Sequence, residues 1–280
     1  MQHHLQFKTK SISLEKPLII GILNLTPDSF YDGGFYKDEK GFLLRVEKML
    51  EEGADIIDIG AVSTRPGAED VILEDETRRL IPAIKKIAQE FPEAILSIDT
   101  YRSEVAKKAI HAGAHIINDI SGGLFDPEMF QTIAQLKVPY ILMHIKGTPK
   151  NMQQNPQYSN VVKEITGFFK QRLSKLKELG ITGNIILDPG FGFGKSLEDN
   201  YMLLKNLSSF KDFGCPLLVG ISRKSMIYKV LGTKPSEALN GTTVIHTLAL
   251  LNGANILRVH DVKEAVEVVK LMEVYKGIEM

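Results

Sequence analysis

Polar side chains follow eight short apolar runs of this 280-residue chain, at the point where each run ends. Any one of them is as readily explained as a cap for the helix that follows. Eight such positions in one chain are better explained as the rim of a single functional site, provided that the runs are neighbouring strands. In chain order the residues are Asn24, Ser63-Thr64-Arg65, Asp99, Asn118-Asp119, His144, Asp188, Ser222-Arg223-Lys224 and Arg258 with His260 and Asp261.

The cationic members of this set suit an anion. Charge and hydrogen-bond donors, which favour a phosphate-bearing substrate, come from Arg65, Lys224, Arg258 and His260. Asn24 adds an amide oxygen, which can bind a hard cation such as Mg²⁺ that accompanies a phosphate. We therefore expect a phosphate or pyrophosphate group at this rim.

The acceptors of the set suit a heterocycle. Asp99, Asn118 and Asp188 interrupt apolar runs and offer two carboxylates and one amide. This combination can recognise a flat ring that presents adjacent N–H donors. The two groups together predict one pocket for a heterocycle that carries a phosphate or pyrophosphate.

A glycine-rich stretch near the sixth run is not a nucleotide-binding loop. The segment GFGFGKS (190–196) lacks the first glycine of a Walker A motif, because Pro189 stands there. We expect its glycines to let the loop approach a ligand closely, with Phe191 or Phe193 as an apolar wall.

Two other signals are discounted. His111 and His115 flank a predicted helix-to-strand turn, so we do not expect them to bind a metal. Cys215 is expected to be a small packed residue rather than a nucleophile, because no partner base can be identified for it.

The apolar runs are predicted to be eight parallel strands. They are rich in Ile, Leu and Val throughout rather than alternating, which is typical of strands covered on both faces. Their starts are on average about 34 residues apart, the length of a strand with its crossover helix. The runs span residues 17–25, 54–61, 94–100, 115–121, 139–145, 185–190, 216–222 and 256–261.

Amphipathic segments between the runs are predicted to be helices, because their apolar residues recur three and four positions apart. Clear examples span 41–53, 73–91, 161–180 and 261–275, with Gly53 and Gly180 where C-caps are expected. Eight strand–helix units predict an α/β fold, a single-domain (β/α)8 TIM barrel, and a doubly wound open sheet is the alternative. We expect residues 17–280 to form this domain and residues 1–16 to be an N-terminal extension.

Composition narrows the classes of function. Lys plus Arg and Asp plus Glu each total 34, and this zero net charge argues against nucleic-acid or anionic-membrane partners. The single cysteine excludes an internal disulfide and favours a reducing compartment. The first apolar run is too short to span a bilayer, and no signal peptide is recognised, so we expect a cytoplasmic protein.

Long motifs in a fixed order resemble those of the dihydropteroate synthase family, the folate-pathway enzymes that sulfonamides target. GILNLTPDSFYDGG (21–34) resembles the family's first signature and DIGAVSTRPGA (58–68) its second. The blocks SIDTYR, INDISGG, MHIKGTPKNMQ, LDPGFGFGK, VGISRKS and RVHDV follow in the family's order. The resemblance runs from about residue 17 to residue 270.

The resemblance implies a reaction. In this family 4-aminobenzoate displaces pyrophosphate from 6-hydroxymethyl-7,8-dihydropterin diphosphate and gives 7,8-dihydropteroate. The diphosphate is thought to leave first, so that the amine attacks a pterin cation and no nucleophilic side chain is required. The resemblance also implies Mg²⁺ as a cofactor, two loops (26–35 and 63–71) that close over the site, and a homodimer through the last helices.

The resemblance further implies roles for individual residues. The pterin would be bound by Asp99, Asn118, Met143, Asp188, Gly192 and Lys224. The 4-aminobenzoate would be bound by Phe30, Thr64, Arg65, Pro66, Phe193 and Ser222. The diphosphate would be bound by Asn24, Thr64, Arg258 and His260, with Asn24 also the magnesium ligand. The catalytic residues would be Asp99, Arg65 and Lys224.

One residue departs from the family pattern. The second signature usually has Glu or Gln before its serine, where this chain has Val62. A buried valine there would weaken the placement of Thr64 and Arg65.

Three alternatives to this activity remain. A methyltransferase that binds a reduced folate on the same barrel would need neither the diphosphate-binding residues nor the STRPG loop, which are both present. A catalytically silent pterin-binding homologue is favoured only by Val62. A Schiff-base aldolase would use Lys224, which follows Arg223 in a loop suited to anions.

Overall fold

The computed structural model describes residues 4–7, 10–25, 35–62 and 71–277, with the side chains of 35–38 left aside. Its main feature is an eight-stranded parallel sheet in the order β8-β7-β6-β5-β4-β3-β10-β9. The strands are β3 (Leu18–Asn24), β4 (Ile56–Gly60), β5 (Ile95–Asp99), β6 (Ile116–Asp119), β7 (Tyr140–Met143), β8 (Ile185–Asp188), β9 (Leu218–Val219) and β10 (Ile256–Val259). Each lies within one of the eight predicted runs.

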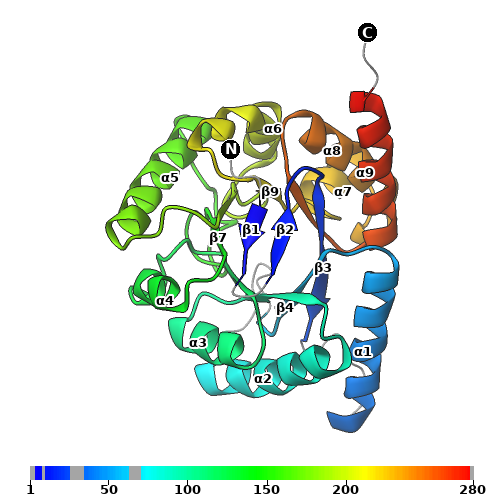
Figure 1. Cartoon of the computed structure of the whole chain (residues 1–280). Helices are drawn as coiled ribbons and strands as arrows, with labels where there is room; N and C mark the ends of the chain where they lie inside the picture. Colours follow the sequence, from blue (N-terminus) through cyan, green and yellow to red (C-terminus); the bar gives the residue numbers. More distant parts are fainter. Residues whose placement is uncertain (1–3, 8–9, 26–34, 63–70, 278–280) are drawn as a thin grey trace.

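The two ends of the sheet meet. A parallel bridge joins Leu187 of β8 to Leu217, immediately before β9, and the Leu187 N–H donates to the Pro216 carbonyl at 2.9 Å. Figure 1 shows the helices arranged as a ring around the strands. The predicted (β/α)8 barrel is therefore confirmed, and the doubly wound alternative is wrong.

The outer ring consists of helices whose apolar faces pack on the barrel. These are α1 (Phe35–Glu51), α2 (Leu73–Glu90), α3 (Ser103–His111), α4 (Met129–Leu136), α5 (Val161–Glu178), α6 (Leu197–Lys205), α7 (Ser225–Leu231), α8 (Leu239–Leu251) and α9 (Val262–Gly277). Gly53 and Gly180 have φ angles of 99° and 79° just after α1 and α5, as their predicted capping role requires. In the part of the chain that the structure describes, no helix is long and apolar enough to cross a membrane.

Side chains alternate between the barrel interior and the helix layer along each strand. Ile20, Ile56 and Ile116 belong to the inner core, whereas their neighbours Ile19 and Ile57 pack with the helices. All eight strands run in the same direction, so their carboxyl ends meet at one end of the barrel. Inward positions near those ends are the ones that face a common pocket.

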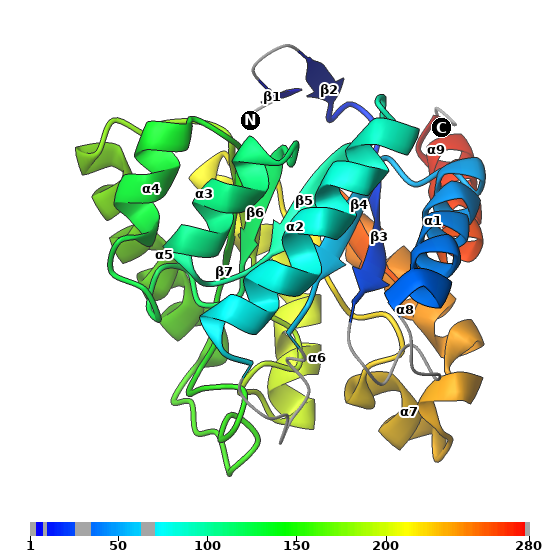
Figure 2. The same ribbon diagram turned by 90° about the horizontal axis from the view of Figure 1, so that it is seen from below.

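The opposite end of the barrel is closed by a hairpin of β1 (His4–Gln6) and β2 (Ser11–Ser13). Leu5, Phe7 and Leu14 from this segment are buried in the inner core with Leu18 and Ile256. Figure 2 shows β1 and β2 at the end of the barrel from which the strands start. The described part of the predicted N-terminal extension therefore seals the barrel floor, which the sequence analysis did not anticipate.

Candidate functional site

The carboxyl ends of adjacent strands bring the predicted acceptors together. Strand register places Asp99 of β5 beside Asn118 of β6, and Met143 of β7 beside Asp188 of β8. Asn118, Met143 and Asp188 each lie two residues beyond an isoleucine of the inner core, and Asp99 lies four residues beyond one. Because side chains alternate along a strand, all four point into the barrel mouth. Arg258 of β10 follows Ile256 in the same way and completes the layer.

Arg258 lies between two carboxylates. Its Nε donates to Asp58 Oδ2 at 2.7 Å, and its Nη2 donates to Asp99 Oδ2 at 3.0 Å. Burial opposes the guanidinium charge, but Asp58 and Asp99 outweigh burial and raise the pKa of Arg258. Burial raises the pKa of Asp99 to about 7; Arg258 opposes this rise and the negative charge of Asp58 adds to it.

Asp58 is a site residue that the sequence analysis missed. Its side chain is fully buried on β4, and Oδ2 accepts a second hydrogen bond from Asn118 Nδ2 at 3.1 Å. The other oxygen, Oδ1, has no hydrogen-bond partner among the described residues. Asp58 thus links a predicted pterin residue to a predicted diphosphate residue. The available signal was a carboxylate inside the apolar run ADIIDIGA.

Lys224 and Asp188 form the other side of the mouth. Asp188 Oδ1 accepts from the Gly190 N–H at 2.7 Å, and burial raises the pKa of this carboxyl despite the opposing charge of Lys224. Burial lowers the pKa of Lys224 to about 8, with Asp188 opposing. Lys224 Nζ donates to the Phe191 carbonyl at 2.6 Å and lies 4.6 Å from the centre of the Phe193 ring.

A small apolar cluster adjoins these polar groups. Met143 is buried with Ile120, Ile145 and Met152, and the half-buried Phe193 packs against them. Two further aromatic residues, Tyr101 and Phe125, pack on the same cluster and were not anticipated. A flat ring could therefore lie between this apolar cluster and the carboxylates. Met143 is placed to pack against one face of such a ring, which is the role that the sequence predicted for it.

The glycine-rich loop corrects one expectation. Gly190 and Gly194 have φ angles of 71° and 65°, and a Cβ at either position would collide with the backbone carbonyl of His144 or Lys146. These two glycines allow a close approach to another loop of the chain, not to a ligand. Gly192 instead faces Lys224, whose Cδ would lie 3.3 Å from a Cβ there. Phe191 is fully buried in the helix layer, so the apolar wall is Phe193.

Two polar residues at strand ends point away from the mouth. Asp119 accepts hydrogen bonds from Ser121, from the Gly123 N–H and from the Tyr140 hydroxyl, which fixes the turn after β6. The His144 ring packs edge-on against Phe168 of α5 with 4.9 Å between centroids, and burial lowers its pKa to about 2. The expectation that these residues line the site is wrong, because each lies on the outward side of its strand.

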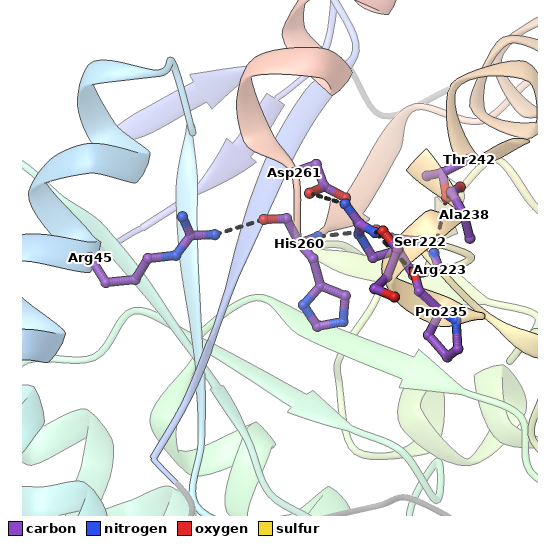
Figure 3. A network of polar contacts seen from close by, with 9 residues as sticks. Arg45, Ser222, Arg223, Pro235, Ala238, Thr242, His260 and Asp261 are labelled. Carbon is purple, nitrogen blue, oxygen red and sulfur yellow. Dashed lines mark hydrogen bonds and ion pairs between the residues drawn. The ribbon is translucent and has the colours of Figure 1, made fainter. Parts of the chain in front are cut away.

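Arg223 is also committed to structure. It pairs with Asp261 through two hydrogen bonds, of 2.8 Å from Nε and 3.0 Å from Nη2, and its Nη1 donates to the carbonyls of Pro235 and Ser236. The backbone of Arg223 forms a tight turn with a φ of 53°. A hydrogen bond from its N–H to Thr242 Oγ1 stabilises this turn (Figure 3). Arg223 and Asp261 therefore join two loops instead of facing a ligand.

Two of the predicted diphosphate residues, Asn24 of β3 and His260 just after β10, line one hollow, whereas Arg258 does not. Asn24 and His260 border a cavity of about 310 Å³ together with Phe42 and Arg45 of α1. Arg45 donates to the His260 carbonyl at 2.7 Å, and the His260 N–H donates to Ser222 Oγ at 3.2 Å. Figure 3 shows Arg45 and Ser222 reaching the His260 backbone from opposite sides. Arg45 was not anticipated, because it lies in the middle of a helix.

Several predicted residues lie outside the described part of the chain. These are Phe30, Thr64, Arg65 and Pro66. Val62 is half-buried rather than buried. The carbonyl of the preceding Ala61 accepts from Arg79 of α2 at 3.2 Å.

The discounted signals have ordinary surroundings. The ring nitrogen Nδ1 of His111 lies 2.6 Å from the Lys107 carbonyl, and Nδ1 of His115 accepts from the Leu96 N–H at 3.2 Å. Burial raises the pKa of Cys215 to about 11, so it is a thiol at neutral pH. Within the described ranges, no three His, Cys, Asp or Glu side chains form a group that could hold a metal ion.

Comparisons with known proteins agree with this geometry. A family model for pterin binding enzymes matches residues 20–260. The dihydropteroate synthase of Escherichia coli K12 is 45% identical over 264 residues, which cover 94% of this chain and 93% of the relative. The chain belongs to the dihydropteroate synthase family.

Solved structures of the family share the whole fold. The Yersinia pestis enzyme, solved with a sulfonamide drug, is 42% identical with a TM-score of 0.92, covering 98% of this chain and 100% of its own. The Xanthomonas albilineans enzyme, solved with 7,8-dihydropteroate, is 36% identical with a TM-score of 0.88, covering 99% and 100%. The resemblance drawn from the motifs is therefore confirmed at the level of the family and of the barrel.

Proposed function

We propose that this protein condenses 4-aminobenzoate with 6-hydroxymethyl-7,8-dihydropterin diphosphate to give 7,8-dihydropteroate and pyrophosphate. The observation that carries the proposal is the single inward layer formed by Asp99, Asn118, Asp188 and Lys224, with Arg258 at its edge. The relatives named above carry the corresponding enzyme name, and one was solved with the product of this reaction.

The pterin would lie against the acceptor layer. Asp99 and Asp188 offer carboxylate oxygens to ring N–H donors, and Asn118 offers an amide whose orientation is set by its bond to Asp58. Met143 would cover one face of the ring. The same two carboxylates lie where a positive charge would develop on the pterin, so they would stabilise the cation that forms when the diphosphate leaves.

The leaving group and the amine would occupy opposite edges of this layer. Arg258 and His260, with Asn24, would bind the diphosphate and stabilise its charge as the C–O bond breaks. Phe193 and Ser222 would border 4-aminobenzoate, together with Phe30, Thr64, Arg65 and Pro66. Lys224, held over the Phe193 ring, would contact both substrates. The amine then attacks the cation, and no covalent enzyme intermediate is required.

Magnesium fits this site only as an ion bound to the diphosphate. Asn24 offers one amide oxygen, and Arg45 and His260, which border the same hollow, are a cation and an imidazole instead of carboxylates. Mg²⁺ commonly binds substrate phosphates through few protein ligands and keeps several waters. When bound with the diphosphate, it would supply charge neutralisation there.

The alternatives gain little from the geometry. A Schiff-base lysine needs a free amine, and the lowered pKa of Lys224 would help to provide one. However, its Nζ is bound to the Phe191 carbonyl and packed on Phe193, which suits recognition of a ring. A folate-dependent methyltransferase would not need the residues proposed for the diphosphate, Arg258 and His260, which are present. The half-buried Val62 alone still favours a silent homologue.

We also propose a homodimer through the last helices, as the family resemblance implied. Large apolar side chains of α8 and α9 are 40% to 72% exposed, namely Val244, Leu248, Leu251, Leu271, Val274 and Tyr275. The two helices are neighbours in the ring (Figure 1). A patch of this kind is typical of a protein interface. Sedimentation at micromolar concentration should give a dimer, which Leu271→Glu with Val274→Glu dissociates and Leu179→Glu leaves intact; a wild-type monomer would refute it.

Two further proposals concern the extent of the catalytic domain and the cellular location of the protein. We propose that residues 17–280 act as one catalytic domain, to which the described part of the 1–16 segment adds the barrel floor. A cytoplasmic location remains the proposal that fits a lone, half-buried cysteine in its thiol form.

One assay tests the catalytic proposal. Release of pyrophosphate from the pterin diphosphate should depend on both 4-aminobenzoate and Mg²⁺, and mass spectrometry should detect 7,8-dihydropteroate. Folded protein that binds the pterin diphosphate without turnover would instead identify a silent homologue.

A further inference from the structure

Lys195 is a lysine buried without a carboxylate partner. Only 3% of its surface is exposed, and no described carboxylate forms an ion pair with it. Its Nζ donates to the Gly190 carbonyl at 2.8 Å and to the Phe193 carbonyl at 3.0 Å, and lies 3.1 Å from His144 Nδ1. An ammonium group has three donors, so these three acceptors satisfy it completely.

Burying this amine is costly. Burial lowers the pKa of Lys195 to about 7, and the nearby Asp188 opposes the shift. Two carbonyls and a neutral imidazole offer no compensating negative charge. Methionine or leucine would fill the same space without that cost, so the retained amine points to a geometric requirement in the loop.

The three contacts fix the shape of the loop between β8 and α6. Lys195 joins the second residue of the loop, Gly190, to its fifth, Phe193, and ties both to His144 after β7. Immediately after Lys195, the Ser196 side chain caps α6 by accepting from the Asp199 N–H. The amine is thus anchored at the start of α6. It adds its contacts to a turn that also has a bond from the Phe193 N–H to the Gly190 carbonyl at 3.1 Å and one from the Gly192 N–H to Asn200 Oδ1 at 2.7 Å.

That turn presents two groups to the candidate site. The Phe191 carbonyl accepts from Lys224 Nζ at 2.6 Å, and the Phe193 ring lies 4.6 Å from the same nitrogen. Phe191 lies between the two residues whose carbonyls accept from Lys195, and Phe193 is one of those two residues. A change at Lys195 would therefore reach the site through Phe193, whose carbonyl Lys195 holds.

We propose that Lys195 is a positioning residue that sets the Phe193 ring for binding of 4-aminobenzoate beside the pterin. This inference rests on the function proposed above. Lys195 touches neither substrate in it, and its effect is carried by the loop.

The test is a double-mutant cycle between Lys195→Met and Phe193→Ala. Lys195→Met should raise the KM for 4-aminobenzoate about tenfold, the factor expected when roughly one good hydrogen bond of positioning is lost, with a smaller change in kcat. In the Phe193→Ala background the same substitution should change that KM by less than about twofold, because the ring it positions is absent. Lys170→Met, at an exposed position of α5, should leave both constants unchanged.

The outcomes separate the inference from the proposed function. If Lys195→Met leaves KM unchanged, or multiplies it equally with and without Phe193, then Lys195 only supports the fold and the inference is refuted. If Phe193→Ala by itself leaves KM unchanged, Phe193 does not contact 4-aminobenzoate and the inference is refuted as well. If the wild type makes no dihydropteroate, the proposed function fails instead.

A second variant keeps the test valid if Lys195→Met does not fold. His144→Leu retains the amine and the longer contact of 3.5 Å to the carbonyl of residue 144, and it removes the imidazole acceptor. It should raise the same KM in the same direction by a smaller factor, and Phe193→Ala should again abolish the effect. A rise that persists without Phe193 overturns the inference.

Discussion

Replacing Asp58 by asparagine removes the buried charge that joins Arg258 to Asn118. The carboxylate oxygen Oδ2 accepts from both, at 2.7 Å and 3.1 Å, on a side chain with no exposed surface. A hydrogen bond to a charged group contributes about 1.5–3 kcal/mol. Arg258 keeps Asp99 in the variant, so the cost of roughly 3–5 kcal/mol for an orphaned buried charge does not apply. We expect the free energy of unfolding to fall by about 2 kcal/mol.

The same substitution should change the ionisation of Asp99. Burial raises the pKa of Asp99, Arg258 lowers it, and the charge of Asp58 raises it further. Without that charge the pKa of Asp99 falls, so the carboxylate persists to lower pH. If catalysis needs ionised Asp99, the acid limb of the pH profile of kcat/KM moves to lower pH, since this limb reports groups of the free enzyme.

Urea denaturation and pH-dependent steady-state kinetics measure the two effects. Asp55→Asn is the matched control, because Asp55 lies just before the start of β4 and accepts from the Ile19 N–H, which an amide oxygen can also do. Burial raises the pKa of Asp55, so loss of its charge should cost under about 1 kcal/mol and leave the pH profile in place. An acid limb that stays in place or moves to higher pH in Asp58→Asn would refute the reasoning.

Three further predictions follow from single sites. In urea denaturation, Gly190→Ala should lower the free energy of unfolding by about 2 kcal/mol or more, because φ is 71° and the new methyl group meets the His144 carbonyl. The control Gly183→Ala, whose methyl group would have nothing within 4 Å, should stay within about 0.5 kcal/mol of the wild type. Burial lowers the pKa of His246 to about 4, so the unfolded chain takes up a proton first as pH falls below 6.5. The free energy of unfolding of the wild type should therefore fall by about 2 kcal/mol more between pH 7 and pH 5 than that of His246→Phe. Equal falls in the two proteins would contradict this. Lys224→Ala should weaken calorimetric binding of the pterin diphosphate at least about tenfold, and unchanged affinity would remove Lys224 from the site.

The strands were predictable because each is short, apolar and followed by a polar residue. The direction of each polar side chain was not. Asn118 and Asp119 are adjacent at the end of one strand, yet Asn118 bonds within the barrel and Asp119 bonds the Tyr140 hydroxyl in the helix layer. A strand buried on both faces shows no alternation, so its sequence carries no sign of which residues face inward. His144 was misassigned for the same reason.

Other parts of the site depend on contacts between distant segments. Lys195 was examined only as part of a failed phosphate-loop motif, because its partners Gly190 and His144 meet only in the folded chain. The hairpin of β1 and β2 is three residues per strand, too short for a periodic signal, and it is held by Leu5 and Phe7 in the barrel core. Arg45 lies within a helix, and its sequence position gives no sign of its contact with the carbonyl of His260, 215 residues further along the chain.

The arrangement around Arg258 explains why Asp58 is needed at all. An anion that binds the guanidinium must compete with Asp99 for Nη2, which also lies 2.7 Å from Asp58 Oδ2, whereas Nε donates to Asp58. A diphosphate could therefore draw Nη2 away while the arginine stays anchored, and Asp99 would be released to accept from the pterin ring. Zero net charge on the whole chain gives no long-range attraction for such an anion. Substrate capture would then depend on this local exchange, in which the arriving diphosphate prepares the carboxylate that the heterocycle requires.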